Sequence, residues 1–154
     1  MPRGIRRFWV LSGVALCAVL AGPIALAQAS DNTLRLTLNS YAQKIVKDEA
    51  AVKAALQGYP GTRGKLVRAL GHEVTDLRSL KRKLAHESAS SARGKRAKSD
   101  IVTGLGLIAN AYAALRRDVQ AAHGGPVPIS KVSAAQRTDR KGRAKFKAGL
   151  KLLS

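Results

Sequence analysis

The amino-acid sequence predicts an all-α protein: an antiparallel bundle of three to four helices, preceded by an N-terminal signal-peptide helix. Three observations predict this class. Apolar residues recur every three or four positions over most of the chain, which places them on one face of a helix. Clusters of glycine, proline and serine interrupt the pattern. The connections between the periodic segments are short, which favours antiparallel neighbours.

Residues 1–29 have the features of a secretory signal peptide in the expected order. Three arginines within residues 1–7 precede an uncharged run over 8–26. Small residues follow, and we expect signal cleavage at a site marked by Ala27 or Ala29. An uncleaved membrane anchor is the alternative, because 19 uncharged residues are just enough to span a bilayer. Both interpretations place the rest of the chain outside the cytoplasm, secreted or in the extracytoplasmic cell envelope.

The bundle core is predicted over residues 30–125, and its first helix over about 32–57. Apolar residues on one face of this helix are Leu34, Leu38, Tyr41, Ile45, Val52 and Ala55. Residues 33–38 also alternate with period two, as a strand would, and a capping box could start the helix at Ser40 instead. We favour helix throughout, because no second strand signal exists for pairing.

Two further helices are predicted over about 63–87 and 99–122. Their inward-facing residues are Leu66, Leu70, Val74, Leu77, Leu80, Leu84, Ile101, Leu105, Ile108, Tyr112, Leu115, Val119 and Ala122. A small-residue stretch over 88–98 is predicted to connect the two helices. Ser99 or Asp100 can then cap the later helix, because their side chains accept from its first free N–H groups.

The third helix is predicted to lie at the centre of the bundle. No charged side chain occurs from Ile101 to Leu115, and a helix that is apolar on most sides is normally buried. Gly104 and Gly106 each cost about 1 kcal/mol relative to Ala in a helix interior. We attribute these glycines to close backbone approach by a neighbouring helix, and a ligand lying against the bared backbone is the alternative.

Residues 126–154 are predicted to form a basic C-terminal helix or tail. As one helix, this segment would dock only through its apolar ends. Alternatively, Gly142 breaks it into a short docking turn and a basic amphipathic tail with Phe146, Leu150 and Leu153 on one side. Such a tail is typical of a helix that lies on an anionic membrane surface, and equally of a last bundle helix with a solvated outer face.

Composition excludes several kinds of chemistry. The chain has 28 basic and 9 acidic side chains and a net charge of +19. Without the three arginines of residues 1–7, 25 basic residues face 9 acidic ones, a net +16. Cys17 is the single cysteine and lies in the predicted signal. The mature chain therefore has no disulfide, zinc–thiolate site, iron–sulfur cluster or cysteine nucleophile.

The positive charge concentrates in two segments, which we interpret as two anion-binding patches. Patch 1 consists of Arg78, Lys81, Arg82, Lys83, Arg93, Lys95, Arg96 and Lys98. Patch 2 consists of Arg137, Arg140, Lys141, Arg143, Lys145, Lys147 and Lys151. Charge of one sign repels itself, and a polyanion would neutralise it. The alternative is an ordinary solvated surface, because lysine and arginine are normal on exposed helix faces.

We expect no catalytic residue, no metal and no cofactor. The acidic residues are scattered, and no nucleotide-binding or nucleophile motif occurs. His72 and Asp76 share a helix face, but two ligands do not hold a catalytic zinc, and His86 is about four turns away. Glu73 falls near the apolar face, where it could pair with a buried cation.

These features favour an exported, non-catalytic protein that binds anionic envelope material: anionic polymers, a phospholipid surface or extracellular nucleic acid. Sequence-specific nucleic-acid binding is not expected, because stacking needs aromatic residues and only four follow the signal. A protein-interaction or self-assembling bundle in the cell envelope is the second hypothesis. A small-ligand carrier of the haem type is the third.

Overall fold

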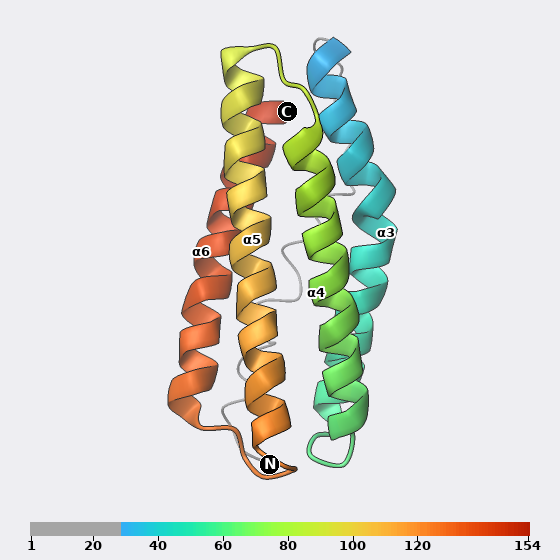
Figure 1. Cartoon of the computed structure of the whole chain (residues 1–154), viewed down its shortest axis with the longest axis vertical. Coiled ribbons are helices and arrows are strands. Elements are labelled where there is room, and N and C mark those ends of the chain that lie inside the picture. Colours follow the sequence, from blue (N-terminus) through green and yellow to red (C-terminus); the bar gives the residue numbers. More distant parts are fainter. Residues whose placement is uncertain (1–28) are drawn as a thin grey trace.

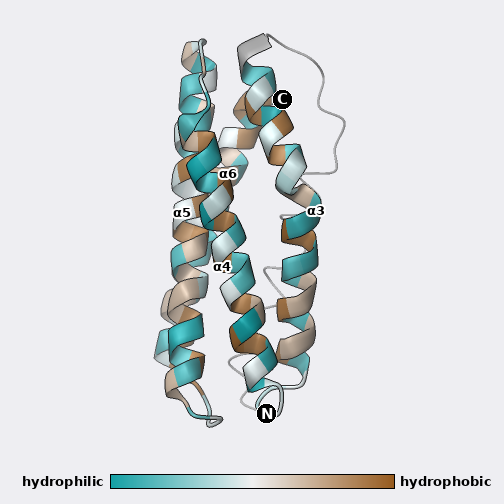
Figure 2. Ribbon diagram, turned by 45° about the vertical axis from the view of Figure 1, so that its right-hand side comes forward, coloured by the Kyte–Doolittle hydropathy of each residue, from teal (hydrophilic) through white to brown (hydrophobic). Residues whose placement is uncertain are grey.

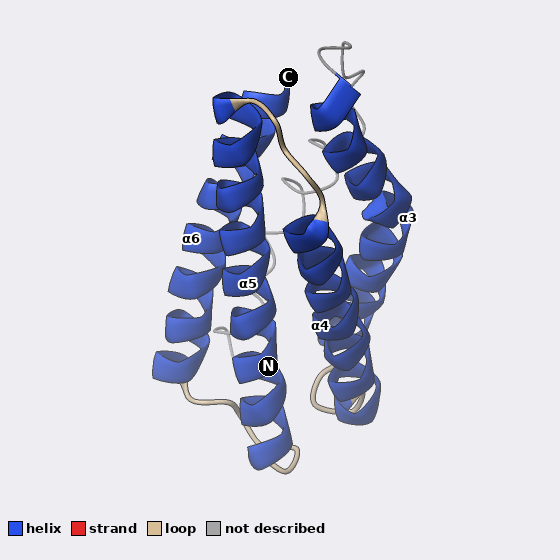
Figure 3. Ribbon diagram, turned by 45° about the horizontal axis from the view of Figure 1, so that its top comes forward, coloured by secondary structure: helices blue, strands red, loops and turns tan. Residues whose placement is uncertain are grey.

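The computed structural model describes residues 29–154, and these residues form four helices joined by three short connections (Figure 1). The helices are α3 (Ala29–Gln57), α4 (Arg63–His86), α5 (Ala92–Ala121) and α6 (Ile129–Leu153). Every secondary-structure element in this part of the chain is helical, which confirms the all-α class (Figure 3). The predicted signal helix, with its cleavage position Ala27, lies outside the described residues.

The four helices run alternately up and down, so the bundle has two distinct ends (Figure 1). The end that holds the α4–α5 connection and the C-terminus is called the connection end. The other, called the turn end, holds the α3–α4 and α5–α6 turns. Three hydrogen bonds join this end: Tyr59 Oη donates to Gly125 O, and Arg63 donates from Nε to Val119 O at 3.2 Å and from Nη2 to Gln120 O at 2.7 Å.

The core runs the length of the bundle between the helices. In Figure 2 brown apolar positions alternate with teal polar ones along each helix, as the sequence periodicity predicts. The largest fully buried side chains are Leu34, Leu38, Ile45, Leu66, Leu70, Leu77, Leu80, Leu84, Ile101, Leu105 and Tyr112. Helix packing follows chain order, α3 on α4, α4 on α5 and α5 on α6. The apolar third predicted helix thus contacts a helix on both sides.

Glycines let α5 and α6 approach each other closely. A Cβ placed on Gly104 would lie 2.6 Å from Phe146 N and 2.7 Å from Gly142 O, closer than atoms can pack. Gly149 contacts α5 in the same way, with Ala97 O at 2.7 Å from its added Cβ. Close backbone approach therefore explains Gly104. The alternative in which Gly142 breaks the last segment is wrong, because Gly142 lies inside a continuous α6 and packs on α5.

The third predicted helix begins seven residues earlier than expected, at Ala92 instead of residue 99. Its start was predicted near Ser99 or Asp100, whereas α5 begins at Ala92. The cap is Ser91, whose Oγ accepts from Gly94 N at 2.7 Å. Alanine, arginine and lysine fill most of the following two turns, and they are strong helix formers. Residues 88–98 were predicted as a connection because they contain small and basic residues and lack the large apolar residues whose spacing indicates a helix.

The first helix is continuous from Ala29, so the strand alternative over 33–38 is wrong. Ser40 does not start the helix either. Its hydroxyl donates to Thr37 O at 2.8 Å, a bond that turns back onto the preceding turn of an existing helix. Leu36, which a strand would have placed with Leu34 and Leu38, is 61 % exposed, while those two are buried.

Candidate functional site

The acidic side chains are withdrawn from the surface. All nine Asp and Glu residues of the chain lie within the described residues, and each is buried or half-buried. Glu49, Glu73 and Asp139 are at most 4 % exposed. Five of the others have side-chain partners: Asp31 with Ser91, Asp76 with Lys44, Glu87 with Thr37, Asp100 with Lys145, and Asp118 with Lys131.

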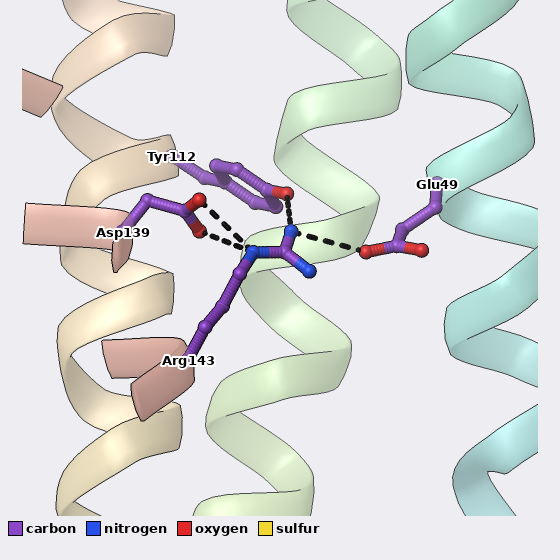
Figure 4. Close-up of polar contacts among 4 residues, drawn as sticks. All are labelled: Glu49, Tyr112, Asp139 and Arg143. Atoms are coloured by element: carbon purple, nitrogen blue, oxygen red, sulfur yellow. Dashed lines mark hydrogen bonds and ion pairs between the residues drawn. The ribbon is translucent and has the colours of Figure 1, made fainter. Parts of the chain in front are cut away.

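The most enclosed acids surround Arg143 in the middle of the bundle (Figure 4). Arg143 Nε donates to both carboxylate oxygens of Asp139, at 2.9 and 3.1 Å. Its Nη2 donates to Tyr112 Oη at 2.9 Å and to Glu49 Oε1 at 3.3 Å. One guanidinium from α6 therefore reaches α5 and crosses the bundle to α3. We call Glu49, Glu73, Tyr112, Asp139 and Arg143 the buried polar cluster.

Glu73 supplies the α4 member of the cluster and differs electrostatically from the other two acids. Within the described residues neither of its carboxyl oxygens has a hydrogen-bond partner, and Arg143 Nη1 also has none. Burial, and after it the nearby Glu49 and Asp48 carboxylates, raise the pKa of Glu73 to about 9 against the opposing effect of Arg143. At pH 7 Glu73 is therefore protonated and neutral.

The other members keep fixed charge states. Burial acts to lower the pKa of Arg143, but Tyr112, Asp139 and Glu49 outweigh it, so the pKa lies above the ordinary arginine range. Burial also holds the pKa of the Tyr112 hydroxyl well above its usual value, so the phenol stays protonated. The cluster thus contains a permanent cation beside two carboxylates that bind it directly.

The geometry assigns the buried polar cluster a structural role. Its carboxylates are occupied by Arg143, and the cluster lies among buried leucines rather than at the surface. A buried ion pair adds little net stability over apolar packing, but it fixes which residues may face one another. We infer that Arg143 fixes the register of α6 against α3, two helices that lie far apart in the sequence.

The basic side chains occupy the opposite environment. Of the 25 basic residues in the described part of the chain, 20 are exposed, whereas none of the nine acids is. Patch 1 is largely exposed, and only Lys81 and Lys98 are half-buried. Lys98 Nζ donates to Glu87 O at 2.6 Å. Patch 2 is exposed along α6 except at Arg143, whose side chain is 11 % exposed.

Arg143 requires a correction, because it does not belong to an exposed patch. It follows Asp139 by one helical turn, so both point to the interior side of α6. The remaining patch 2 residues lie on other faces of the helix, and Lys145 pairs with Asp100 at the surface. Patch 2 therefore consists of Arg137, Arg140, Lys141, Lys145, Lys147 and Lys151.

The structure brings the two patches together at the connection end. Arg93 Nη2 of patch 1 lies 3.4 Å from Lys151 O and 3.3 Å from Ser154 O, at the end of patch 2. Exposed cations also occur at the turn end, outside both predicted patches. These are Lys53, Lys65, Arg68, Arg116, Arg117 and Lys131. The exposed cations thus form a coat over both ends rather than two separate patches.

His72 and Asp76 have different surroundings in the structure. Asp76 accepts from Lys44 Nζ at 3.0 Å, and His72 is exposed on α4. Over the described residues, no group of three His, Cys, Asp or Glu side chains is arranged to hold a metal ion. The same part of the chain contains no helix with the length and apolarity needed to cross a membrane.

The sequence contained a signal for the buried polar cluster that patch counting missed. Asp139 follows Val132 and Ala135 and precedes Gly142 and Phe146 at alternating spacings of three and four. This spacing puts it on the inward face of the helix. Glu49 lies between Ile45 and Val52 by the same rule. An acid at an inward position, with an arginine one turn later, predicts a buried ion pair.

Comparisons of the chain with protein families, with curated proteins and with solved structures found no match. The functional argument therefore rests on the distribution of charge that the fold creates.

Proposed function

We propose that this protein is a non-catalytic binding protein that contacts anionic polymers through its coat of exposed cations. One observation carries the proposal: 20 basic side chains are exposed, while every acidic side chain is buried or half-buried. A surface with cations and few competing carboxylates attracts negatively charged partners from any direction. Binding then comes from many weak contacts rather than from one shaped site.

The same charge distribution argues against a purely solubilising role for the lysines and arginines. Solubility alone is served by mixed charges, which do not repel one another. Here every exposed Asp, Glu, Lys or Arg side chain is basic, and these cations repel one another, which opposes the compact state. A polyanion would remove this repulsion and stabilise the bundle by binding the folded chain.

The place of action that we propose is the cell envelope or its exterior. This rests on the arginines, the apolar run and the small residues of positions 1–29. Outside the cytoplasm the available polyanions are envelope polymers, anionic lipid surfaces and released nucleic acid. Of these we favour a flexible anionic polymer, because cations at both ends of the bundle can contact it along its length.

Two variants with equal loss of charge test whether the coat binds as a whole. The connection-end variant carries Lys95→Gln, Arg96→Gln, Lys147→Gln and Lys151→Gln. The turn-end variant carries Lys53→Gln, Lys65→Gln, Arg68→Gln and Arg117→Gln. All eight residues are exposed. Binding to long-chain inorganic polyphosphate at low salt would be measured by calorimetry for the unaltered chain and both variants.

A distributed coat predicts that both variants bind more weakly and to a similar extent, because each loses four contacts. Neutral dextran serves as the control polymer and should not bind. Failure of the unaltered chain to bind polyphosphate at low salt would contradict the proposed function. Full loss of binding in one variant with no change in the other would contradict the distributed coat, and would show that one localised site binds the polymer.

A further inference from the structure

A depression of about 490 Å³ opens at the connection end, where the last turn of α4, the α4–α5 connection and the first turns of α5 meet. This volume lies within the range of small-molecule sites, about 300–1,000 Å³. The residues around it are Ala85, Glu87, Ser88, Ala89, Lys95, Lys98, Ser99 and Val102. They combine small apolar side chains with two lysines, two serines and one glutamate.

The apolar part of the depression is continuous with the core. Ala89 and Val102 are partly buried and pack against the buried core residues. They leave an edge of the core accessible at this point of the surface. An apolar group placed here would cover that edge and gain the ordinary free energy of removing apolar area from water.

The polar part of the depression is cationic. Lys98 is half-buried, and its Nζ is positioned by donating to Glu87 O at 2.6 Å. An ammonium group has three N–H donors, and this bond uses one of them. Lys95 is exposed one turn earlier on α5. A negatively charged head group between these lysines would gain charge-assisted hydrogen bonds.

The acids near the depression already have partners. Glu87 Oε1 accepts from Thr37 Oγ1 on α3 at 3.0 Å. Asp31 Oδ2 accepts from Ser91 Oγ at 3.0 Å, and the Asp31 carboxylate lies against Gly94 in the first turn of α5. Asp31 therefore occupies the amide end of α5, where a negative charge is favourable. A ligand anion would meet the lysines rather than this helix end.

We infer that the depression binds a monomeric, single-chain amphiphilic anion. Its acyl chain lies on Ala89 and Val102, and its carboxylate or phosphate head group lies between Lys95 and Lys98. A polymer without an apolar part would gain nothing from Ala89 and Val102. This site is therefore distinct in ligand class from the polyanion coat, and the two can fail separately.

The probe for this site is n-decyl phosphate, kept below the concentration at which it forms micelles. Amide ¹H–¹⁵N spectra of the full chain would be recorded during titration. The largest shifts are expected at Ala85–Ala89 and Lys95–Val102, with saturation at one ligand per chain. Inorganic phosphate lacks the alkyl chain and decyl maltoside lacks the charge. Each should bind at least about tenfold more weakly than decyl phosphate.

Two substitutions separate volume from charge. Ser99→Trp would fill the depression from the exposed side of α5 without changing net charge, and should abolish the decyl phosphate shifts at Ala85–Ala89. Asn110→Trp, exposed on the same helix and outside the depression, is the matched control. Lys95→Gln should weaken decyl phosphate binding by about tenfold, the loss of one charge-assisted contact.

Polyphosphate binding provides the readout that keeps the two proposals apart. Ser99→Trp should leave it unchanged, because the coat of cations is intact. Equal effects of Ser99→Trp and Asn110→Trp on decyl phosphate binding would overturn the inference. So would shifts that map away from the depression, or decyl maltoside binding as tightly as decyl phosphate.

Discussion

The interior and the exterior of this bundle use charge in opposite ways. Inside, one guanidinium from α6 binds carboxylates from α3 and α6 and a phenol from α5, all at hydrogen-bond distance. Outside, 20 cations are exposed with no exposed carboxylate among the described residues. The difference shows that net charge alone misleads. The +16 of the described part is 25 basic minus 9 acidic residues, and because all nine acids are buried or half-buried, the exposed Asp, Glu, Lys and Arg side chains are all basic.

Arginine therefore contributes differently to stability at two positions of one helix. Arg140 and Arg143 are three positions apart on α6, and the first is exposed while the second is buried in the polar cluster. A buried charge that loses its partner is costly, because its desolvation is no longer offset. An exposed charge is solvated whether or not it has a partner. Substitutions at these two positions give the sharpest test of the comparison.

The largest effect is expected for Arg143→Met. It removes the guanidinium that binds the buried carboxylates of Glu49 and Asp139, and should lower the free energy of unfolding by about 3–5 kcal/mol. Arg140→Met removes the same charge from the surface and should change it by no more than about 0.5 kcal/mol. Urea denaturation at neutral pH measures both. Equal destabilisation by the two variants would contradict the claim that the buried Arg143 contributes more to stability than the exposed Arg140.

A pH-dependent effect is expected for Glu73→Gln. The folded-state pKa of Glu73, about 9, lies above its ordinary value of 4.5, so the folded chain binds one more proton than the unfolded chain between these values. The stability from this group is full below pH 4.5 and is lost as pH rises through about 9. Glutamine keeps the shape of neutral Glu73 and cannot ionise, so the variant should lose this alkaline decline.

The measurement is the free energy of unfolding from about pH 4 to 10 for the unaltered chain and for Glu73→Gln. Asp76→Asn, at a half-buried acid on the same helix, is the comparison. The two curves should lie closest near pH 4.5, separate increasingly up to about pH 9 and run parallel above it, with Glu73→Gln the more stable. Parallel curves across the whole range would mean that Glu73 is not held protonated.

Sequence periodicity predicted the helical class because most apolar positions of all four helices face one core. It also predicted the reason for Gly104, since a glycine in an apolar helix indicates close backbone approach. Two features escaped it. The start of α5 depends on Ser91 meeting both Gly94 N and Asp31, and the second contact is tertiary. The inward side of Arg143 was overlooked because counting charges along a segment ignores which helix face each one occupies.

The surface was predictable in composition but not in arrangement. Arg93 of patch 1 and Lys151 of patch 2 are 58 positions apart in the sequence, and only the antiparallel order of α5 and α6 brings them to one end. The turn-end cations come from all four helices, so no single run of charge marks them in the sequence. Their exposure follows from the burial of the acids, which is a property of packing rather than of any one segment.

The measurement that most directly tests the central claim is the salt dependence of binding to a double-stranded DNA duplex, used as a polyanion of known charge density. If the exposed cations bind phosphates, log K should fall linearly with log salt concentration, by about 0.9 per phosphate contacted. We expect at least about six contacts, and so an affinity loss of about 10³ or more between 50 and 200 mM salt. A slope near zero, or no binding at 50 mM salt, would contradict the account.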